Sequence, residues 1–389
     1  MTFWLYFIYF WLCLIPIYVD SISINYIYVL LPFFLIFLKG KIQKPSNLII
    51  TLFVIFFFIF YLGVGLSFFE DYGLQARRIS SYFIFTSIFF YSILLIEENI
   101  VDAFKKAVIL ISCYYCCISI FNFFYLGGNM IGYDQKDLVG SQRYGFVYLF
   151  ALFLLIQDAA IYNKNLKNIG VILLVVGSFL TFSRATIVAM TITFILYLIF
   201  EKKKISSITK KNKFLLFFKI IFFTGCIAAI LFYLFPVLLD FFYERIIGRI
   251  FLKSDNYEIY DSENSEGFRL QVWESILRLV FKNPLTGSSY LGSYILKDVV
   301  VGSAHNQYFD ILLRTGFLGF GAYLVLILKL LKFLFNKKRI FFWAFVSVLL
   351  YGFFHETFKE TQGAFILTFI IGLYSNEKVN SLVKALPIK

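Results

Sequence analysis

The sequence predicts an all-α fold, a polytopic transmembrane bundle of about 12 spans in one domain that covers residues 1–389. Hydrophobic residues make up 60% of the chain and charged residues only 15%, with a mean hydropathy of +0.82. Apolar runs of roughly 20 residues, long enough to cross a bilayer core about 30 Å thick, recur along the whole chain. These values depart so far from those of ordinary globular domains that a soluble fold is excluded.

The predicted spans follow in order along the chain. The first apolar run, "TFWLYFIYFWLCLIPIYV", lacks the basic start and the small-residue cleavage site of a removable signal, so we expect it to stay as a membrane helix. The twelve expected spans lie at about 3–19, 22–38, 47–67, 79–96, 107–126, 144–160, 169–182, 185–200, 214–236, 306–331, 340–355 and 362–376.

The loops between these spans divide by charge. If the N-terminus is cytoplasmic, every loop on the same side carries lysine, as the positive-inside rule requires. These inner segments are "KGKIQK", "EENIVDAFKK", "NKNLKN", "EKKKISSITKKNK", "KLLKFLFNKKR" and the tail "NEKVNSLVKALPIK". We therefore expect both termini to be cytoplasmic.

The outer side holds both histidines and most arginines. A guanidinium group offers a planar fork that suits a phosphate or carboxylate, so these arginines favour a shared anion-binding site. The alternative is that they pair with acids of the same loops, as Glu244 can with Arg245 and Glu274 with Arg278. The nine outer arginines are Arg77, Arg78, Arg143, Arg184, Arg245, Arg249, Arg269, Arg278 and Arg314, and only Arg339 is expected inside.

A long outer loop, residues 237–305, separates spans nine and ten. Its acidic stretch "SDNYEIYDSENSE" is typical of a solvated loop. The next segment, "FRLQVWESILRLVF", has apolar residues at helical spacing and predicts a short amphipathic helix that ends near Asn283, Pro284 and Gly287. No loop is long enough for a separate soluble domain.

Arg184 lies in "LTFSRATIVAM", where two apolar runs meet almost without a loop. An unpaired charge near membrane depth costs several kcal/mol, so Arg184 is expected to face a water-filled cavity, a partner or an anionic ligand. The alternative is that its side chain extends to the membrane interface.

His305 begins the motif-like stretch "HNQYFDILLRTGFLGFGAYL" and is one of two histidines in the chain. Its imidazole suits proton transfer near neutral pH, and Asn306 could orient a substrate. Asp310 and Arg314, at i and i+4, predict an ion pair within one helix. Three glycines that follow, at positions 316, 319 and 321, favour close packing on a neighbouring helix.

The other histidine, His355, is an alternative candidate for the same role. Its simpler interpretation is an interfacial histidine paired with a nearby acid such as Glu356.

Metal, cofactor and nucleic-acid functions have little support in the sequence. The five cysteines all lie in apolar runs, where thiols pack as small hydrophobic groups. The outer loops lack D-x-D, HExxH and CxxC motifs, so we expect no metal and no cofactor. The lysine excess behind the net charge of +13 follows from topology and from attraction to anionic lipid, so no nucleic-acid partner is expected.

Three motifs, in order along the chain, carry a resemblance to a known family. The stretch "HNQYFDILLRTGFLG" fits the pattern H-N-x9-G-x-x-G, which resembles the signature of the O-antigen ligase and polymerase superfamily of bacterial membrane glycosyltransferases. "SRA" between two spans and "GFRLQVWESILRLVFKNPLTG" ahead of the histidine are similar to that family as well. The resemblance extends from Arg143 to the end of the helix after His305.

The resemblance implies a metal-independent, inverting glycosyltransferase of the bacterial inner membrane with a periplasmic active site. Its donor would be a glycan on undecaprenyl diphosphate, its acceptor another glycan, and a chain-length regulator a further partner. By motif position, Arg184 and Arg269 would hold the diphosphate and His305 would activate or align the acceptor hydroxyl. Arg143, Arg245, Arg249 and Asn306 are expected to contribute to substrate binding.

Several functions stay open at this point. A polymerase of oligosaccharide repeat units is favoured over a ligase that joins the finished chain to lipid A core, because the outer segment is compact and the chain short. A transporter of the lipid-linked unit would place polar residues at the membrane midplane, where this sequence is nearly free of them. A non-catalytic assembly partner is a further alternative.

Overall fold

The computed structural model describes thirteen stretches of the chain: 3–8, 18–19, 22–23, 30–39, 42, 90–125, 145–158, 163–180, 183–201, 265–285, 287, 305–358 and 361–385. The predicted spans at 47–67 and 214–236 lie outside the described residues, as do most of the span at 79–96 and most of the loop at 237–305.

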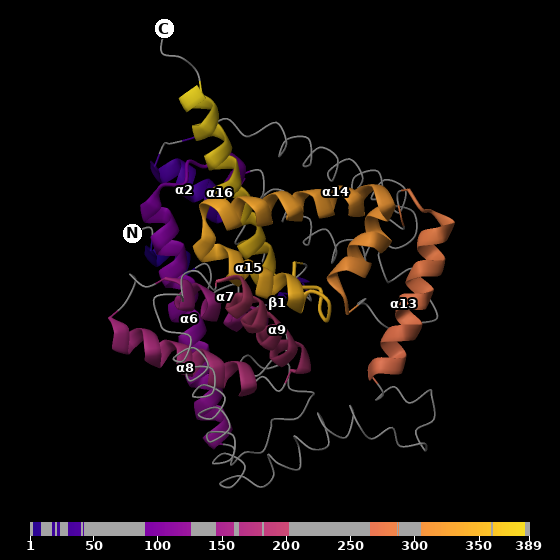
Figure 1. Ribbon diagram of the computed structural model, residues 1–389, viewed down its shortest axis with the longest axis horizontal. Coiled ribbons are helices and arrows are strands. Elements are labelled where there is room, and N and C mark those ends of the chain that lie inside the picture. The colour runs from indigo at the N-terminus through magenta and orange to yellow at the C-terminus, as the bar shows by residue number, and fades with distance from the viewer. Residues whose placement is uncertain are drawn as a thin grey trace.

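The described residues are almost entirely helical (Figure 1). The helices are α2 (Leu30–Lys39), α6 (Glu98–Tyr125), α7 (Gly145–Gln157), α8 (Lys164–Leu180), α9 (Arg184–Phe200), α13 (Ser265–Lys282), α14 (Gln307–Lys337), α15 (Arg339–Tyr351) and α16 (Thr361–Ala385). Two two-residue strands, β1 (Tyr18–Val19) and β2 (Ile22–Ser23), pair antiparallel.

Helix α7 lies at the centre of the helix group. It is apolar on all sides, and every residue from Gly145 to Leu155 is buried, as expected for a helix that neighbours enclose. Helices α6, α8, α9, α15 and α16 all contact it. A helix so enclosed provides a rigid frame for whatever its ends carry.

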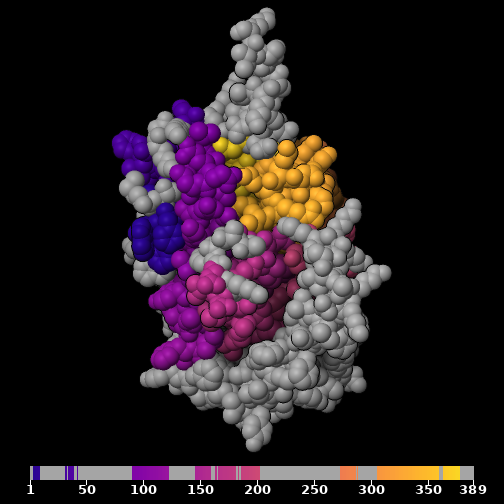
Figure 2. Space-filling model, turned by 60° about the vertical axis from the view of Figure 1, so that its left-hand side comes forward, coloured from indigo at the N-terminus to yellow at the C-terminus, as the bar shows by residue number. Residues whose placement is uncertain are grey.

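Helix α6 and its neighbours form part of the outer surface. Figure 2 shows α6 as a purple column beside the magenta surface of α8 and α9 and the orange surface of α14 and α15. Large apolar side chains on this helix are exposed, including Leu110 at 41% and Phe121 at 65%. Exposed apolar surface of this kind suits contact with lipid tails rather than water.

By length and composition, two described helical segments could cross a membrane, Glu98–Phe121 and Gln307–Lys337. Four shorter apolar helices accompany them in the described part of the chain: Gly145–Gln157, Asn165–Leu180, Ala185–Phe200 and Arg339–Tyr351. The all-α prediction is confirmed for the described residues apart from the small hairpin. The number of spans, about 12, stays a prediction.

Several helices extend beyond the predicted spans at the ends that were expected to be cytoplasmic. Helix α6 begins at Glu98 rather than near 107, so the loop "EENIVDAFKK" is largely helical. Lys105 is tolerated there because its ammonium group pairs with Asp102 at 2.7 Å and with Asp158 at 2.9 Å. The expected amphipathic helix over 268–281 is present as α13.

Helix α14 is bent at Gly316, whose φ of 62° lies in the left-handed region. The first segment, Gln307–Thr315, lies beside α13, while the second runs across the helix group (Figure 1). A Cβ at Gly316 would come within 2.5 Å of the Leu285 backbone, so only glycine fits this position. The close packing predicted for the glycines is therefore confirmed at Gly316.

The other two glycines of α14 do not pack this way. A Cβ at Gly319 would meet Thr315 of the same helix, and at Gly321 it would meet nothing within 4 Å among the described residues. The sequence pattern alone gave these three glycines the same role.

Candidate active site

The structure brings together the two histidines of the chain. The ring centroids of His305 and His355 lie 6.5 Å apart, with the rings inclined at 73° in an edge-to-face arrangement. Both side chains are partly exposed. The histidines were predicted as competing candidates, whereas the structure places them in one site.

Asn306 determines how His305 is held. His305 has a φ of 48°, an uncommon conformation for a residue other than glycine. Asn306, 4% exposed, is the N-cap of α14: its Oδ1 accepts from the backbone N–H groups of Tyr308 and Phe309 at 2.9 and 3.1 Å. Its Nδ2 donates to the Phe353 carbonyl at 2.9 Å.

This geometry gives Asn306 a capping and linking role. The substrate contact predicted for this residue is not among its hydrogen bonds in the structure.

Gln307 also bonds the start of α14 to the segment 352–358. Its backbone N–H donates to the Gly352 carbonyl at 2.8 Å, and its buried Oε1 accepts from the Phe358 N–H at 2.7 Å. The segment 352–358, which carries His355, is thus bonded to the start of α14 at several points. Sequence reasoning missed Gln307, because its partners lie about 50 positions away along the chain.

An aromatic contact connects His355 to the central helix. Its ring stacks on Tyr351 with centroids 5.0 Å apart and planes inclined at 17°. Tyr351 is fully buried and lies 5.7 Å from the ring of Phe146, near the start of α7. The imidazole therefore rests on the rigid core of the molecule.

The start of α9, which carries Arg184, lies at the same end of the helix group. Gly145 at the start of α7 packs so closely on Thr186 that a Cβ would approach its Oγ1 to 2.0 Å. Ser183 caps α9 by accepting from the Thr186 N–H at 3.3 Å, and Arg184 is the first helical residue. The positive end of a helix dipole accompanies Arg184 and favours an anion nearby.

Helix α13 carries Arg269 and runs parallel to the first segment of α14. Trp273 stacks on Phe309 at 5.1 Å and Phe281 lies 6.5 Å from Phe317, so both contacts join residues 36 positions apart. Arg269 and His305 are separated by the same number of positions in the sequence. Arg269 lies one helical turn before Trp273, which places this part of α13 near the level of the histidines.

Two other outer arginines pair with acids, as the alternative interpretation predicted. Arg314 Nε donates to Asp310 Oδ2 at 2.8 Å, and both side chains are buried. Arg278 pairs with Glu274 at 2.6 Å on the exposed face of α13. The two ion pairs predicted from i, i+4 spacing are confirmed.

The remaining predicted binding residues, Arg143, Arg245 and Arg249, lie outside the described residues. Among the residues that the structure describes, no three His, Cys, Asp or Glu side chains are grouped as a metal site would require.

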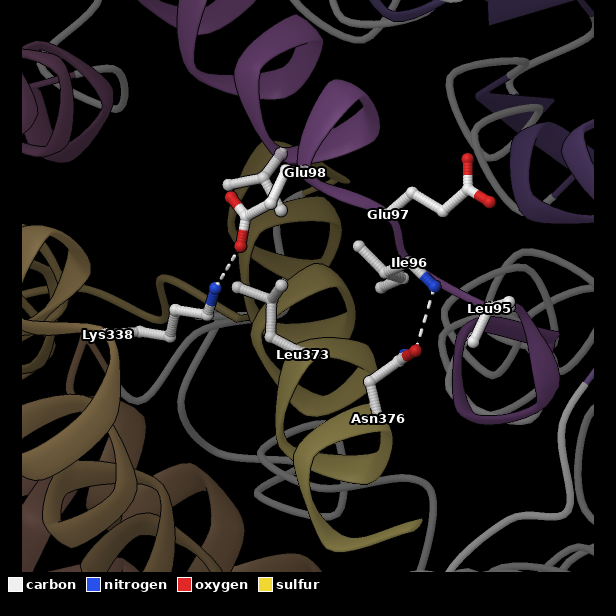
Figure 3. A pocket seen from close by; sticks show the side chains of 8 residues that line it. Leu95, Ile96, Glu97, Glu98, Lys338, Leu373 and Asn376 are labelled. Atoms are coloured by element: carbon white, nitrogen blue, oxygen red, sulfur yellow. Dashed lines mark hydrogen bonds and ion pairs between the residues drawn. The ribbon is translucent and has the colours of Figure 1, made fainter. Parts of the chain in front are cut away.

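The loops that were predicted to be cytoplasmic meet at the opposite end of the helices. Lys338 pairs with Glu98 at 2.5 Å, and Asn376 accepts from the Ile96 N–H at 2.9 Å, at the rim of a pocket (Figure 3). Arg339 and Trp343 both donate to Glu201, at 2.6 and 3.0 Å. The lysine-rich segments and the histidines thus lie at different ends of the described helices.

Comparison with known proteins agrees with the motifs. Residues 169–324 match the sequence profile of a family described as O-Antigen ligase. This range contains Arg184, Arg269, His305 and Asn306, whereas His355 lies beyond it.

A curated relative is the ComP-specific O-oligosaccharyltransferase of Acinetobacter baylyi (strain ATCC 33305 / BD413 / ADP1), which is 24% identical over 377 residues. The alignment covers 88% of this chain and 64% of the relative, so the chain spans less than two thirds of the relative's length. Together these matches support the O-antigen ligase superfamily for residues 169–324, and they confirm the resemblance that the chain's motifs carry.

Proposed function

We propose that this protein transfers an oligosaccharide from an undecaprenyl-diphosphate carrier to an acceptor hydroxyl on the periplasmic face of the bacterial inner membrane. The observation that carries the proposal is the meeting of His305, His355 and the start of α9 at one end of the helices. The lysine-rich segments lie at the other end. The match of residues 169–324 to the O-antigen ligase family supports the same reaction class, transfer of a lipid-linked glycan.

The proposed reaction requires an anion-binding site next to a general base. In the proposed reaction the acceptor oxygen attacks the anomeric carbon, and the diphosphate leaves from the opposite side with inversion. Arg184 and Arg269 would stabilise the charge on the leaving diphosphate without a metal, and Arg143, Arg245 and Arg249 would add further contacts. A preorganised donor of this kind contributes about 3–4 kcal/mol to transition-state stabilisation.

His305 would take the proton of the acceptor hydroxyl. A positioned general base contributes about 10²- to 10⁴-fold to such a rate. Asn306 fixes His305 by capping α14 and by bonding to the Phe353 carbonyl. We therefore assign Asn306 to positioning the base, and any further contact with the substrate would be secondary.

The acceptor distinguishes three related activities. We favour a polymerase that extends a chain of repeat units. Its two substrates would be glycans, and a chain-length regulator is a further proposed partner. The family description favours a ligase, and the name of the curated relative supports transfer to a hydroxyl group of another acceptor.

A deletion strain distinguishes these acceptors by its products. A lipid A core that carries one repeat unit supports the polymerase. Long carrier-linked chains beside a bare core support the ligase, and loss of glycan from an acceptor other than the core, such as a protein, supports transfer to a third kind of acceptor. Unchanged glycans in all three fractions contradict transfer.

Alanine substitutions at Arg184, Arg269 and His305, with expression matched by immunoblot, test the site in the same strain. We expect each to shorten or abolish the glycan products. Normal products from all three would contradict the enzymatic site and would favour a transporter or an assembly partner.

A further inference from the structure

His355 lies close enough to His305 to act with it. The two rings are 6.5 Å apart between centroids, and the histidines come from segments on either side of α14 and α15. Hydrogen bonds that hold this arrangement join Asn306 to Phe353 and Gln307 to Gly352 and Phe358. These hydrogen bonds form a junction between the start of α14 and the loop at 352–358.

The proposed reaction leaves His305 with a proton that it must lose before the next turnover. The acceptor oxygen forms its bond to the anomeric carbon, the bond from that carbon to the diphosphate oxygen breaks, and its electron pair leaves with the diphosphate. The hydroxyl proton goes to His305. A second base beside His305 would return it to its neutral form.

We propose that His355 is a positioning residue that acts through His305. It faces His305 across the junction, accepts the proton that His305 has taken from the acceptor hydroxyl, and passes it to water. This inference rests on the proposed function. The separation of 6.5 Å between the ring centroids leaves room for one bridging water between the two imidazoles.

The surroundings of His355 suit this role. Its ring is held flat against the buried ring of Tyr351, so it cannot easily turn away from His305. Its side chain is only partly exposed, which leaves a route to water. The neighbouring Glu356 is buried and is the nearest acid in sequence.

The test uses the purified full-length chain in nanodiscs with a lipid-diphosphate-linked glycan donor and a hydroxyl acceptor. His355→Phe keeps a flat ring on Tyr351 but cannot carry a proton, and His355→Ala leaves space for added imidazole. We expect both variants to lower kcat at least about tenfold with an unchanged KM for donor and acceptor. Added imidazole should restore His355→Ala and leave His355→Phe unchanged.

Gly321→Ala is the control, since a Cβ at this position of α14 meets nothing within 4 Å in the described part of the chain. It should keep both kcat and KM. Full activity in His355→Phe would overturn the inference, because the contact would then be one of packing alone. An activity loss in His355→Ala that imidazole does not restore would overturn it as well.

Failure of the proposed function gives a different result. If the wild-type chain transfers no glycan, or if His305→Ala keeps full activity, the reaction or the base is wrong. If the wild type is active, His305→Ala is inactive and both His355 variants are normal, only the role of His355 is lost.

Discussion

At the residue scale, single polar side chains connect parts of the chain that are far apart in sequence. Asn306 caps α14 with its oxygen and bonds to the 352–358 loop with its nitrogen. Gln307 bonds to that loop through its backbone and its side chain. Because these polar groups are buried, removing one of their hydrogen bonds lowers the stability of the fold substantially.

Asn306→Asp separates the two functions of this side chain. A carboxylate still caps α14, whereas the donor to the Phe353 carbonyl is lost. We expect a loss of about 1–3 kcal/mol in stability in detergent, because the Phe353 carbonyl loses its donor, and a clear fall in glycan transfer, because the two histidines lose one of their links. Asn306→Ala removes both functions and should lower stability by about 1 kcal/mol more. Equal transfer by Asn306→Asp and wild type would contradict the linking role.

The buried pair of Asp310 and Arg314 should respond strongly to removal of one partner. Asp310→Ala leaves a buried guanidinium without its carboxylate, and we expect a loss of about 3–5 kcal/mol in the free energy of unfolding. Thermal unfolding in detergent measures it. Arg278→Ala is the control, since its pair with Glu274 has the same spacing but is 76% and 64% exposed, and an exposed helical pair contributes about 0.3–0.5 kcal/mol.

At the element scale, the bend of α14 allows one helix to serve two purposes. Its first segment packs on α13 through Val272, Ile276, Leu312 and Leu313. Its second segment joins the main core through Tyr323 and Leu330. The backbone of Leu285 and Gly287 fills the space at the bend, where the Phe317 N–H donates to the Pro284 carbonyl at 2.8 Å.

Gly316→Ala should disturb this junction. The added methyl group would meet the Leu285 backbone, and the φ of 62° disfavours alanine. We expect a lower melting temperature and weaker transfer, because α13 brings Arg269 toward His305. Gly321→Ala places the same methyl group on the same helix with nothing within 4 Å in the described part of the chain. Similar losses in both variants would contradict the importance of the bend.

At the scale of the whole molecule, the described helices have two chemically different ends. One end gathers Glu98, Glu201, Lys338 and Arg339 in ion pairs, and the other gathers the two histidines. This arrangement follows if consecutive spans alternate in direction, because the segments with lysine then fall on one side.

Cysteine labelling in intact cells tests which side each end faces. In a background without native cysteines, we expect a membrane-impermeant maleimide to label Phe353→Cys directly. Lys337→Cys, which is also exposed, should react only after the inner membrane is permeabilised. The reverse pattern would contradict a periplasmic active site, and equal labelling of both positions in sealed cells would contradict the two-sided arrangement.

The sequence by itself determined the helical class of the described residues and the resemblance to the O-antigen ligase superfamily. Apolar runs and i, i+4 charge pairs act over short distances along the chain, so they can be read from the sequence. The motif residues Arg184, Arg269 and His305 were predicted for the same reason, because each lies within a local pattern.

Only the tertiary structure decided that His305 and His355 lie close together and that Gly316 alone among three similar glycines closely approaches the backbone of another segment. It also decided that Lys105 lies within a helix, with its charge matched by Asp158 from α7's end. The positions of the histidines and of Lys105 depend on contacts between segments about 50 positions apart. The role of Gly316 depends on the path of the backbone. No periodicity in the sequence records such contacts, because packing between distant segments is set by the fold as a whole.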